Sequence, residues 1–368
     1  MDPSAFPSCR AFAKIDGRAL CRNYHLLLLK AQESNPRAQL IAVVKDDAYG
    51  HGLSVVLPLL LQAGCDFFAV ATAAEALAAR AICPKADILV LGYTPPSLAH
   101  ILAQARVTQT VFSADYGAAL NDALKTVDCR LRCHIKMNGG LCRGGFDPDD
   151  TKGMLGLLSH ARLLPTGIYT HFPAADTDRS GTRRALYALC HAADLLQQTG
   201  TSLFVHAAAS AAALTMPDTV LDGIRTGIAL YGLPPVPTEL PLAPVLSLHA
   251  PVVCLSRVGA GTPIGYGGDL ITKRETLLGT LPIGYGDGLW RSLRTLTATL
   301  HHKNETFAAP ILGRICMDHT IVDLTDTPAE IGDTVCLWQS ADLPAYHANT
   351  IPYEILTAVS KRVERRLV

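Results

Sequence analysis

"LIAVVKDDAYGHG", residues 40 to 52, sets five apolar residues directly before Lys45 and follows the lysine with two aspartates. A short apolar run of this length, rich in valine and isoleucine, predicts a buried strand. We expect this strand to deliver Lys45 to its carboxyl end. The glycines at positions 50 and 52 then let the backbone come close to a ligand.

Runs of the same kind recur through the first two-thirds of the chain. The eight candidate strands are residues 40 to 44, 67 to 70, 88 to 93, 109 to 113, 131 to 137, 165 to 172, 202 to 208 and 223 to 232. Alanine- and leucine-rich segments with helical spacing lie between them, such as TAAEALAARAI at 72 to 82. Strands that alternate with helices predict a parallel sheet, and eight such units predict a closed (β/α)8 TIM-type barrel. An open doubly wound sheet is the alternative.

The pattern changes after the proline-rich segment PPVPTELPLAPV, residues 234 to 245. Short alternating segments separated by turns replace the helical spacing, which predicts antiparallel strands, with HKNE at 302 to 305 as a hairpin turn. We therefore expect two domains. They are a barrel over residues 1 to 238 and a smaller, mainly antiparallel β domain over residues 239 to 368.

Composition narrows the function classes. Hydrophobic residues make up 49% of the chain and charged residues 17%, against about 25% charged in an average protein. The 32 basic and 32 acidic residues balance, and no basic block is longer than the terminal KRVERR, which argues against nucleic acid as a partner. The apolar run LSVVLPLLLQAGC, residues 53 to 65, is shorter than the roughly 20 residues of a bilayer span. We expect a core helix there.

The cysteines and the first residues predict a cytoplasmic protein. The start MDPSAFPSCR lacks the charged and apolar regions of a signal peptide, and the 11 cysteines include no C-x-x-C pair.

The pair His301 and His302 stands beside a probable turn, and no H-E-x-x-H occurs, so no metal site is expected.

Unusual polar residues gather where the strands of the predicted barrel end, which is the active face of such barrels. They are Lys45, Arg143, His171, Ser210 and Arg225, with Gly227 beside Arg225 on the eighth strand. A lysine, two arginines, a histidine and glycine amides suit an anionic ligand with a carbonyl group, a description that pyridoxal phosphate fits. A lysine between apolar walls loses hydration, which favours its neutral, nucleophilic form. A rim lysine paired with Asp46 or Asp47 is the alternative that these residue types leave open.

The stretch AVVKDDAYGHG, residues 42 to 52, resembles the pyridoxal phosphate attachment signature of alanine racemases. Further segments resemble the same family in order and spacing: AFAKIDGRALCRN (11 to 23), HIKMNGGLCRGGF (134 to 146), YTHFPAAD (169 to 176), VHAAASAAAL (205 to 214), IRTGIALYG (224 to 232), PIGYGGD (263 to 269), LPIGYGDG (281 to 288), GRICMDHTIVDLT (313 to 325) and PYEILTAVSKRV (352 to 363). The resemblance covers nearly the whole chain and both expected domains.

The resemblance implies an amino-acid racemase that interconverts L-alanine and D-alanine on pyridoxal phosphate. Lys45 would form the Schiff base with the cofactor and serve as one base for the Cα proton. Tyr266 would be the second base, on the opposite face of the substrate. In the family this tyrosine comes from the partner subunit, so the resemblance implies a homodimer with shared active sites.

The resemblance also implies roles for the residues around the cofactor. The phosphate would be held by Tyr49, Ser210, Tyr353 and the backbone amides of Gly227 and Ile228. Arg225 would face the pyridine nitrogen, and His171 would link it to Tyr266. Because arginine cannot release its proton, Arg225 would hydrogen-bond the pyridine nitrogen without protonating it.

A second group of residues is implied to act on the substrate. Arg143 would lie near the phenolic oxygen of the cofactor and the substrate carboxylate, and Met317 would donate a backbone N–H to that carboxylate. Asp318 would steady the adjoining site, and Tyr285 would narrow the entrance. Lys136 corresponds to a lysine that is often carbamylated in the family, where it orients the residue matching Arg143.

Several positions depart from the family pattern and keep alternatives open. The residues are Asp46 in place of alanine, Asn138 and Gly139 in place of Asp-Thr, Ala209 in place of asparagine, Gly265 in place of serine and Gly286 in place of alanine. None removes an implied catalytic group, but they leave the preferred amino acid open. A serine or broad-specificity racemase is the first alternative. A pyridoxal phosphate-dependent decarboxylase and a non-catalytic cofactor-binding barrel protein are the others.

Overall fold

The structure is a computed structural model that describes residues 10 to 368. The chain divides into two compact units. The barrel unit comprises Arg18–Ala48 and Val56–Ala243, and the β unit comprises the described residues up to Gly17 together with Tyr49–Val55 and Pro244–Val368. Each unit has its own sheet and its own core.

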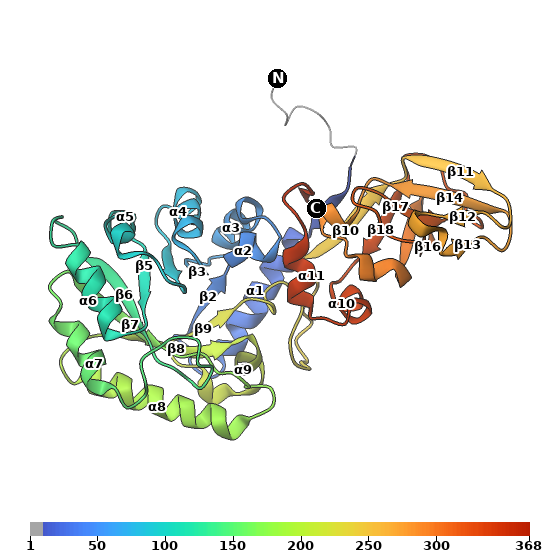
Figure 1. Ribbon diagram of the computed structural model, residues 1–368. Coiled ribbons are helices and arrows are strands. Elements are labelled where there is room, and N and C mark those ends of the chain that lie inside the picture. The colour runs from blue at the N-terminus through green and yellow to red at the C-terminus, as the bar shows by residue number, and fades with distance from the viewer. Residues whose placement is uncertain (1–9) are drawn as a thin grey trace. The chain divides into compact units, whose positions relative to one another are not determined.

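Eight parallel strands close the barrel in sequence order (Figure 1). They are β2 (Gln39–Val43), β3 (Phe67–Val70), β4 (Asp87–Val90), β5 (Thr108–Val111), β6 (Leu131–Lys136), β7 (Leu163–Tyr169), β8 (Phe204–Ala209) and β9 (Gly223–Thr226). Strand β9 pairs with β2, with Ile224 opposite Leu40, so no edge is left open. The predicted (β/α)8 class and its eight strand positions are confirmed, and the open sheet is excluded.

Helices cover the outside of the barrel (Figure 1). They are α1 (Gly17–Gln32), α3 (Leu53–Gln62), α4 (Ala73–Ile82), α5 (Ala99–Gln104), α6 (Ala114–Ala123), α7 (Thr151–Gly156), α8 (Arg179–Gln197) and α9 (Ser210–Thr215), with 3-10 turns at Pro96–Leu98, Leu157–Ser159 and Pro217–Thr219. In α8, Leu186, Leu189 and Leu196 are buried at helical spacing, so one stripe of the helix packs inward. The core helix expected within residues 53 to 65 is confirmed as α3.

The eighth strand is shorter than expected. Strand β9 ends at Thr226, and residues 227 to 232, predicted as strand, form turns instead. The Leu230 N–H donates to the Gly227 carbonyl at 2.8 Å and closes the first of these turns. The apolar residues that suggested a longer strand are buried in the turns, as Ile228, Ala229 and Leu230 show. Burial alone does not distinguish a strand from a packed turn.

The β unit contains a nine-stranded sheet and a small hairpin. The sheet order is β11, β14, β17, β16, β15, β18, β10, β1, β19. Their bounds are β1 (Phe12–Ile15), β10 (Leu246–Pro251), β11 (Cys254–Val258), β14 (Thr276–Leu281), β15 (Thr297–His302), β16 (Glu305–Leu312), β17 (Thr320–Asp323), β18 (Thr334–Trp338) and β19 (Glu364–Leu367), and the hairpin strands are β12 (Pro263–Ile264) and β13 (Leu270–Ile271).

Most pairs in this sheet are antiparallel, as predicted, and the turn between β15 and β16 falls inside HKNE. The one parallel pair of the sheet joins β1 to β19, with Phe12 opposite Glu364. Strand β1 comes from the start of the chain, so the sheet of the β unit is not built from C-terminal residues alone. Short helices complete the unit: α10 (Asp342–Ala348), α11 (Pro352–Ala358) and 3-10 turns at Tyr266–Gly268, Tyr285–Asp287 and Arg291–Thr295. Within residues 10 to 368, no helix has both the length and the apolar character needed to cross a membrane.

Candidate active site

Lys45 lies at the carboxyl end of the first barrel strand. Strand β2 ends at Val43, and the Val44 N–H extends its pairing by donating to the Ala69 carbonyl at 2.8 Å. Lys45 is half-buried. Burial lowers the pKa of its amine, the nearby Arg143 lowers it further, and Asp46 and Glu75 act in the opposite direction. A lysine with a lowered pKa supplies more of the neutral amine that attacks carbonyl groups.

The residues after Lys45 form a left-handed turn, labelled α2 (Lys45–Tyr49) in Figure 1. Asp46, Asp47 and Ala48 have φ/ψ of 56/54°, 52/45° and 56/51°, and Tyr49 has a φ of 53°. This conformation costs an L-residue about 1–2 kcal/mol, and aspartate tolerates it better than most. The aspartate at position 46, where the family usually has alanine, thus has a physical explanation in its backbone conformation.

Arg225 is a buried cation near the carboxyl end of β9. It is 4% exposed, and among the described residues it forms no ion pair. Instead its Nη2 donates to the carbonyl oxygens of Thr170 at 2.7 Å and Ala207 at 2.8 Å, and its Nη1 lies 2.8 Å from Nδ1 of His206. Burial lowers its pKa to about 10, so it stays charged at neutral pH. A buried charge that is held by neutral acceptors is available to a further, anionic or lone-pair, partner.

His206 and His134 continue this network through the barrel interior. His206 Nε2 lies 2.9 Å from Nδ1 of His134, and both rings are buried. Burial and neighbouring arginines lower the pKa of His134 to about 3 and that of His206 well below its usual value, so both are neutral. Gly167 makes room for the pair, because a Cβ there would lie 2.6 Å from the His134 ring.

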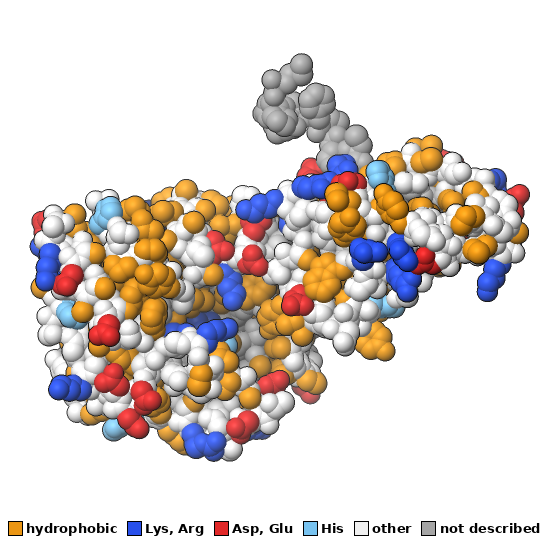
Figure 2. All heavy atoms as spheres, viewed as in Figure 1, with side chains coloured by type: hydrophobic (Ala, Val, Ile, Leu, Met, Phe, Trp, Pro, Cys, Tyr) orange, Lys and Arg blue, Asp and Glu red, His pale blue; other side chains and the backbone are white. Residues whose placement is uncertain are grey.

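Positive groups surround His171, which follows β7. Burial lowers its pKa to about 3, with Arg225, Arg143, Lys136 and Lys45 acting in the same direction. Lys136 donates from Nζ to the carbonyl oxygen of Arg143 at 2.8 Å, and burial together with Arg143 and Arg225 lowers its pKa. In Figure 2 the face of the barrel unit is hollowed, and lysine and arginine side chains lie along the hollow. This concentration of positive charge suits an anion.

Ser210 adjoins the turn that follows β9. Its Oγ accepts a hydrogen bond of 3.4 Å from the Ala229 N–H, and the side chain is 5% exposed. The turn from Gly227 to Leu230 therefore packs against the start of α9. The structure thus brings together Ser210, Gly227 and Ile228, three of the five predicted phosphate-binding residues.

The other two, Tyr49 and Tyr353, are neighbours within the β unit. Their ring centroids lie 6.1 Å apart. Tyr49 is buried, and Tyr353 lies in the first turn of α11.

Tyr285 and Met317 lie together in the β unit. The N–H groups of Tyr285 and Gly286 donate to the carbonyl oxygens of Cys316 at 3.0 Å and Met317 at 2.9 Å. The Tyr285 side chain is 42% exposed and that of Met317 is 54% exposed, so both face outward. Asp318 accepts a 2.6 Å hydrogen bond from Arg362, which lowers the pKa of the carboxyl.

Tyr266 stands on the turn between β12 and β13 and is 71% exposed. It borders a cavity of about 200 Å³ that Arg294 and Arg314 also line. Gly265, directly before it, has φ 69° and ψ −169°, a conformation that only glycine adopts at low cost. The replacement of the family's serine by Gly265 therefore fits the local backbone.

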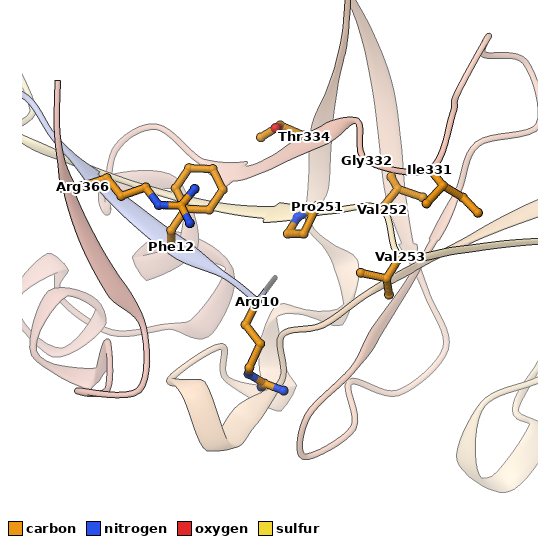
Figure 3. A pocket seen from close by; sticks show the side chains of 9 residues that line it. All are labelled: Arg10, Phe12, Pro251, Val252, Val253, Ile331, Gly332, Thr334 and Arg366. Carbon is orange, nitrogen blue, oxygen red and sulfur yellow. The ribbon is translucent and has the colours of Figure 1, made fainter. Parts of the chain in front are cut away.

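A larger cavity of about 420 Å³ lies elsewhere in the β unit (Figure 3). It is lined by apolar residues such as Val253 and Ile331 and by Arg10 and Arg366. Arg366 covers the Phe12 ring at 4.0 Å and pairs with Glu364 at 2.7 Å. None of the predicted site residues lines this cavity.

Comparisons with known proteins agree with this geometry in both units. Residues 15–235 match the family model "Alanine racemase, N-terminal domain", and residues 245–367 match "Alanine racemase, C-terminal domain". The chain belongs to the alanine racemase family. Its match to the paired models of these isomerases confirms the family that the sequence resembled.

Individual alanine racemases are similar over most of their length. The chain is 34% identical to that of Desulfovibrio desulfuricans, over 88% of this chain and 89% of the relative. It is 36% identical to that of Geobacillus stearothermophilus, over 89% and 86%. A crystal structure of alanine racemase from Bacillus anthracis with bound L-Ala-P has a TM-score of 0.89 at 31% identity, covering 99% of this chain and 96% of the other.

Some residues of this alanine racemase site were not assigned a role from the sequence. The predicted link ran from His171 to Arg225, whereas the hydrogen-bonding histidine of Arg225 in the structure is His206. Glu75, which accepts hydrogen bonds next to Lys45, was also missed. His206 lies within VHAAASAAAL on β8, and nothing in that segment identifies its hydrogen bond to Arg225. Glu75 has the capping-box spacing T-x-x-E, which suggested only a helix start.

Proposed function

We propose that the chain interconverts L-alanine and D-alanine with pyridoxal phosphate as cofactor. The observation that carries the proposal is the position of Lys45. It follows a buried strand, its amine has a lowered pKa, and it lies in the same positive barrel mouth as Arg225. The names of the family models and of the similar proteins support alanine as the substrate.

The donor set at the barrel mouth fits the cofactor. An amine, a hydroxyl, turn amides and a buried guanidinium match its aldehyde, phosphate and ring nitrogen, with Lys45, Ser210, Gly227 and Arg225 in these roles. When bound, pyridoxal phosphate withdraws electrons and makes the Cα hydrogen of an amino acid acidic. We infer that Tyr49, Tyr353 and Ile228 complete the phosphate site, as in the resembled family.

Arg225 would hydrogen-bond the ring nitrogen without giving up its proton. Its three hydrogen bonds within the barrel leave it charged and fixed in orientation. Arginine has no acceptor and a pKa too high to act as an acid, so it would leave the ring nitrogen of the bound cofactor unprotonated. The cofactor would then be a weaker electron sink, which would favour direct return of the proton at Cα over other reactions.

Racemisation needs one base on each face of Cα, because a single base tends to return the proton to the face that it left. We propose that Lys45 holds the proton on one face and Tyr266 on the other. Tyr266 would come from the β unit of a second subunit, so the working form would be a homodimer. Tyrosine has an ordinary pKa of about 10, so it needs positive neighbours that lower this pKa before it can act as a base near neutral pH. His171 would lie between Tyr266 and the charged Arg225 and would connect the two.

The remaining residues would bind and select the amino acid. Arg143 and the Met317 N–H would hold its carboxylate, and Asp318 would steady the segment that carries Met317. Tyr285 and Tyr353 would leave little room beyond a methyl group. Lys136 would orient Arg143, either as the amine that bonds the Arg143 carbonyl or as the carbamate of the family pattern.

Serine is the closest rival substrate because it adds only a hydroxyl group to alanine. Arg225 disfavours the decarboxylase alternative, because in that group of enzymes an acidic residue faces the ring nitrogen. The non-catalytic barrel protein lacks the β unit that carries Tyr266. A cytoplasmic location remains a prediction from the cysteine pattern.

A racemisation assay over a panel of amino acids tests the proposal. The purified chain, supplied with pyridoxal phosphate, should be yellow and should bring L-alanine and D-alanine to an equal mixture, with serine slower. A yellow protein that leaves L-alanine optically unchanged across a range of pH would support the cofactor carrier instead. Carbon dioxide released from an amino acid would support the decarboxylase.

A further inference from the structure

The carboxylate of Glu75 collects three backbone N–H groups beside Lys45. Its Oε1 accepts from Asp46 at 2.6 Å, and its Oε2 accepts from Ala71 at 2.8 Å and Thr72 at 3.1 Å. The Thr72 bond belongs to the capping box of α4, in which the Glu75 N–H also donates to Oγ1 of Thr72 at 3.2 Å. In a capping box the glutamate side chain accepts one hydrogen bond, from the N–H of the N-cap residue. The bonds from Asp46 and Ala71 are therefore additional to the motif.

The Asp46 amide is the first one after the predicted catalytic lysine and starts the left-handed turn. Four successive non-glycine residues with positive φ follow Lys45, each in a conformation that normally occurs singly. Such a turn persists only where its surroundings hold it. On the barrel side, the Ala48 N–H donates to the Val44 carbonyl at 3.0 Å, and the Asp46 N–H donates to Glu75. Glu75 therefore ties the turn to α4, a helix of the barrel wall.

We propose that Glu75 is a positioning residue that fixes the backbone at Lys45 and thereby the direction of its amine. The proposal rests on the function proposed above, in which Lys45 carries the cofactor and moves the Cα proton. Both steps require a fixed amine, since a displacement of about 1 Å at a reacting group costs on the order of 100-fold in rate.

The residue type matters because the two oxygens have separate partners. A glutamine has only one oxygen, so it can keep the bonds of the helix start or the bond to Asp46, but not both. An aspartate is one methylene shorter, so it does not span the same three donors from the same backbone position. Glutamate alone among these side chains satisfies the whole set.

Three variants separate positioning from helix capping. Glu75→Ala removes all three hydrogen bonds, and Glu75→Gln keeps part of them. Thr72→Ala is the matched control, because it breaks the same capping box from the other side and leaves the bond to Asp46 in place. The readouts on the holoenzyme are kcat, KM, the rate at which pyridoxal phosphate is lost, and hydrogen exchange of the amides in residues 45 to 50.

We expect Glu75→Ala to lower kcat roughly 10- to 100-fold, to speed cofactor loss and to raise amide exchange in residues 45 to 50. Glu75→Gln should fall between it and the wild type, and Thr72→Ala should match the wild type in all three. Equal behaviour of Glu75→Ala and Thr72→Ala would overturn the proposal, and Glu75→Gln decides it if the alanine variant does not fold. A wild-type protein that neither binds the cofactor nor racemises alanine would contradict the proposed function, while the exchange measurement would still test Glu75.

Discussion

The guanidinium of Arg225 fixes the proton positions of His206, whose Nδ1 lies 2.8 Å from Nη1 of the arginine. Arginine donates and never accepts, so Nδ1 of His206 must be the acceptor and the proton of the neutral ring sits on Nε2. That proton then points at Nδ1 of His134, 2.9 Å away. The orientation of Arg225 is thus set by a neutral histidine ring and the backbone carbonyls of Thr170 and Ala207, rather than by a carboxylate.

Removing the acceptor of Arg225 should destabilise the barrel. His206→Leu leaves one N–H of a buried cation unsatisfied, and we expect the free energy of unfolding to fall by about 2–4 kcal/mol. His206→Gln retains an acceptor and should lose less. Denaturant unfolding of both variants measures the difference. Equal losses would mean that packing, and not the hydrogen bond, is what His206 supplies.

Buried neutral histidines should make the fold sensitive to acid. The folded pKa values of His134 and His171 are about 3, below the ordinary value of 6.5, so the unfolded chain binds more protons between these limits. The free energy of unfolding is therefore unaffected by these histidines above pH 6.5. It decreases as the pH falls from 6.5 toward 3, by up to about 1.4 kcal/mol per pH unit for each histidine. Unfolding measured from pH 7 to pH 4.5 gives this slope. His134→Gln should reduce it, and an unchanged slope would contradict the assignment.

The barrel was predictable because its signal is repeated. Eight apolar runs separated by helical segments leave few other arrangements, and errors of a few residues at each strand end do not change the class. The β unit was less predictable at its borders. Strand β1, residues 12 to 15, is far in sequence from its partners in β10 and β19, and nothing local in four residues identifies that pairing.

The candidate site was predictable where a residue type carries the chemistry, as with Lys45 and Arg225. The supporting residues were not, because their role depends on the direction of a side chain in three dimensions. His206 acts through a hydrogen bond to a residue 19 positions away, and Glu75 acts through one to a residue 29 positions away. The periodicity of a strand or helix does not show which residues that are distant in sequence form hydrogen bonds with each other.

Gly265 should resist the serine that the family usually has at this position. Its φ of 69° with ψ of −169° costs a residue with a Cβ about 1–3 kcal/mol. We expect Gly265→Ser to lower the free energy of unfolding by about this amount, as measured by denaturant titration. Gly259→Ser is the control, since a Cβ at Gly259 meets nothing within 4 Å. Equal stability of the two variants would show that the Tyr266 turn relaxes at little cost.

Asp46 should stabilise the left-handed turn through its backbone preference. Asp46→Ala keeps the N–H that bonds Glu75 but loses the tolerance of aspartate for positive φ, so we expect a loss of about 0.5–1 kcal/mol. Asp46→Asn should be nearly neutral, and Asp46→Val should lose more than alanine. The order of the three unfolding free energies is the check. If alanine equals asparagine, the side chain at this position has no conformational role.

Tyr266→Phe should impair proton transfer on one face of Cα only. The equilibrium constant for racemisation of alanine is one, so kcat/KM must fall equally in both directions, and overall rates do not distinguish the faces. We expect kcat/KM to drop by about 10²–10⁴-fold, the usual contribution of a general base. The decisive measurement is the isotope effect with alanine deuterated at Cα, which should become large for the enantiomer whose proton Tyr266 removes and stay small for the other. Tyr285→Phe is the control, because it removes a hydroxyl at the predicted entrance and should leave the two enantiomers alike. Equal isotope effects for both enantiomers in Tyr266→Phe would show that this tyrosine is not the second base.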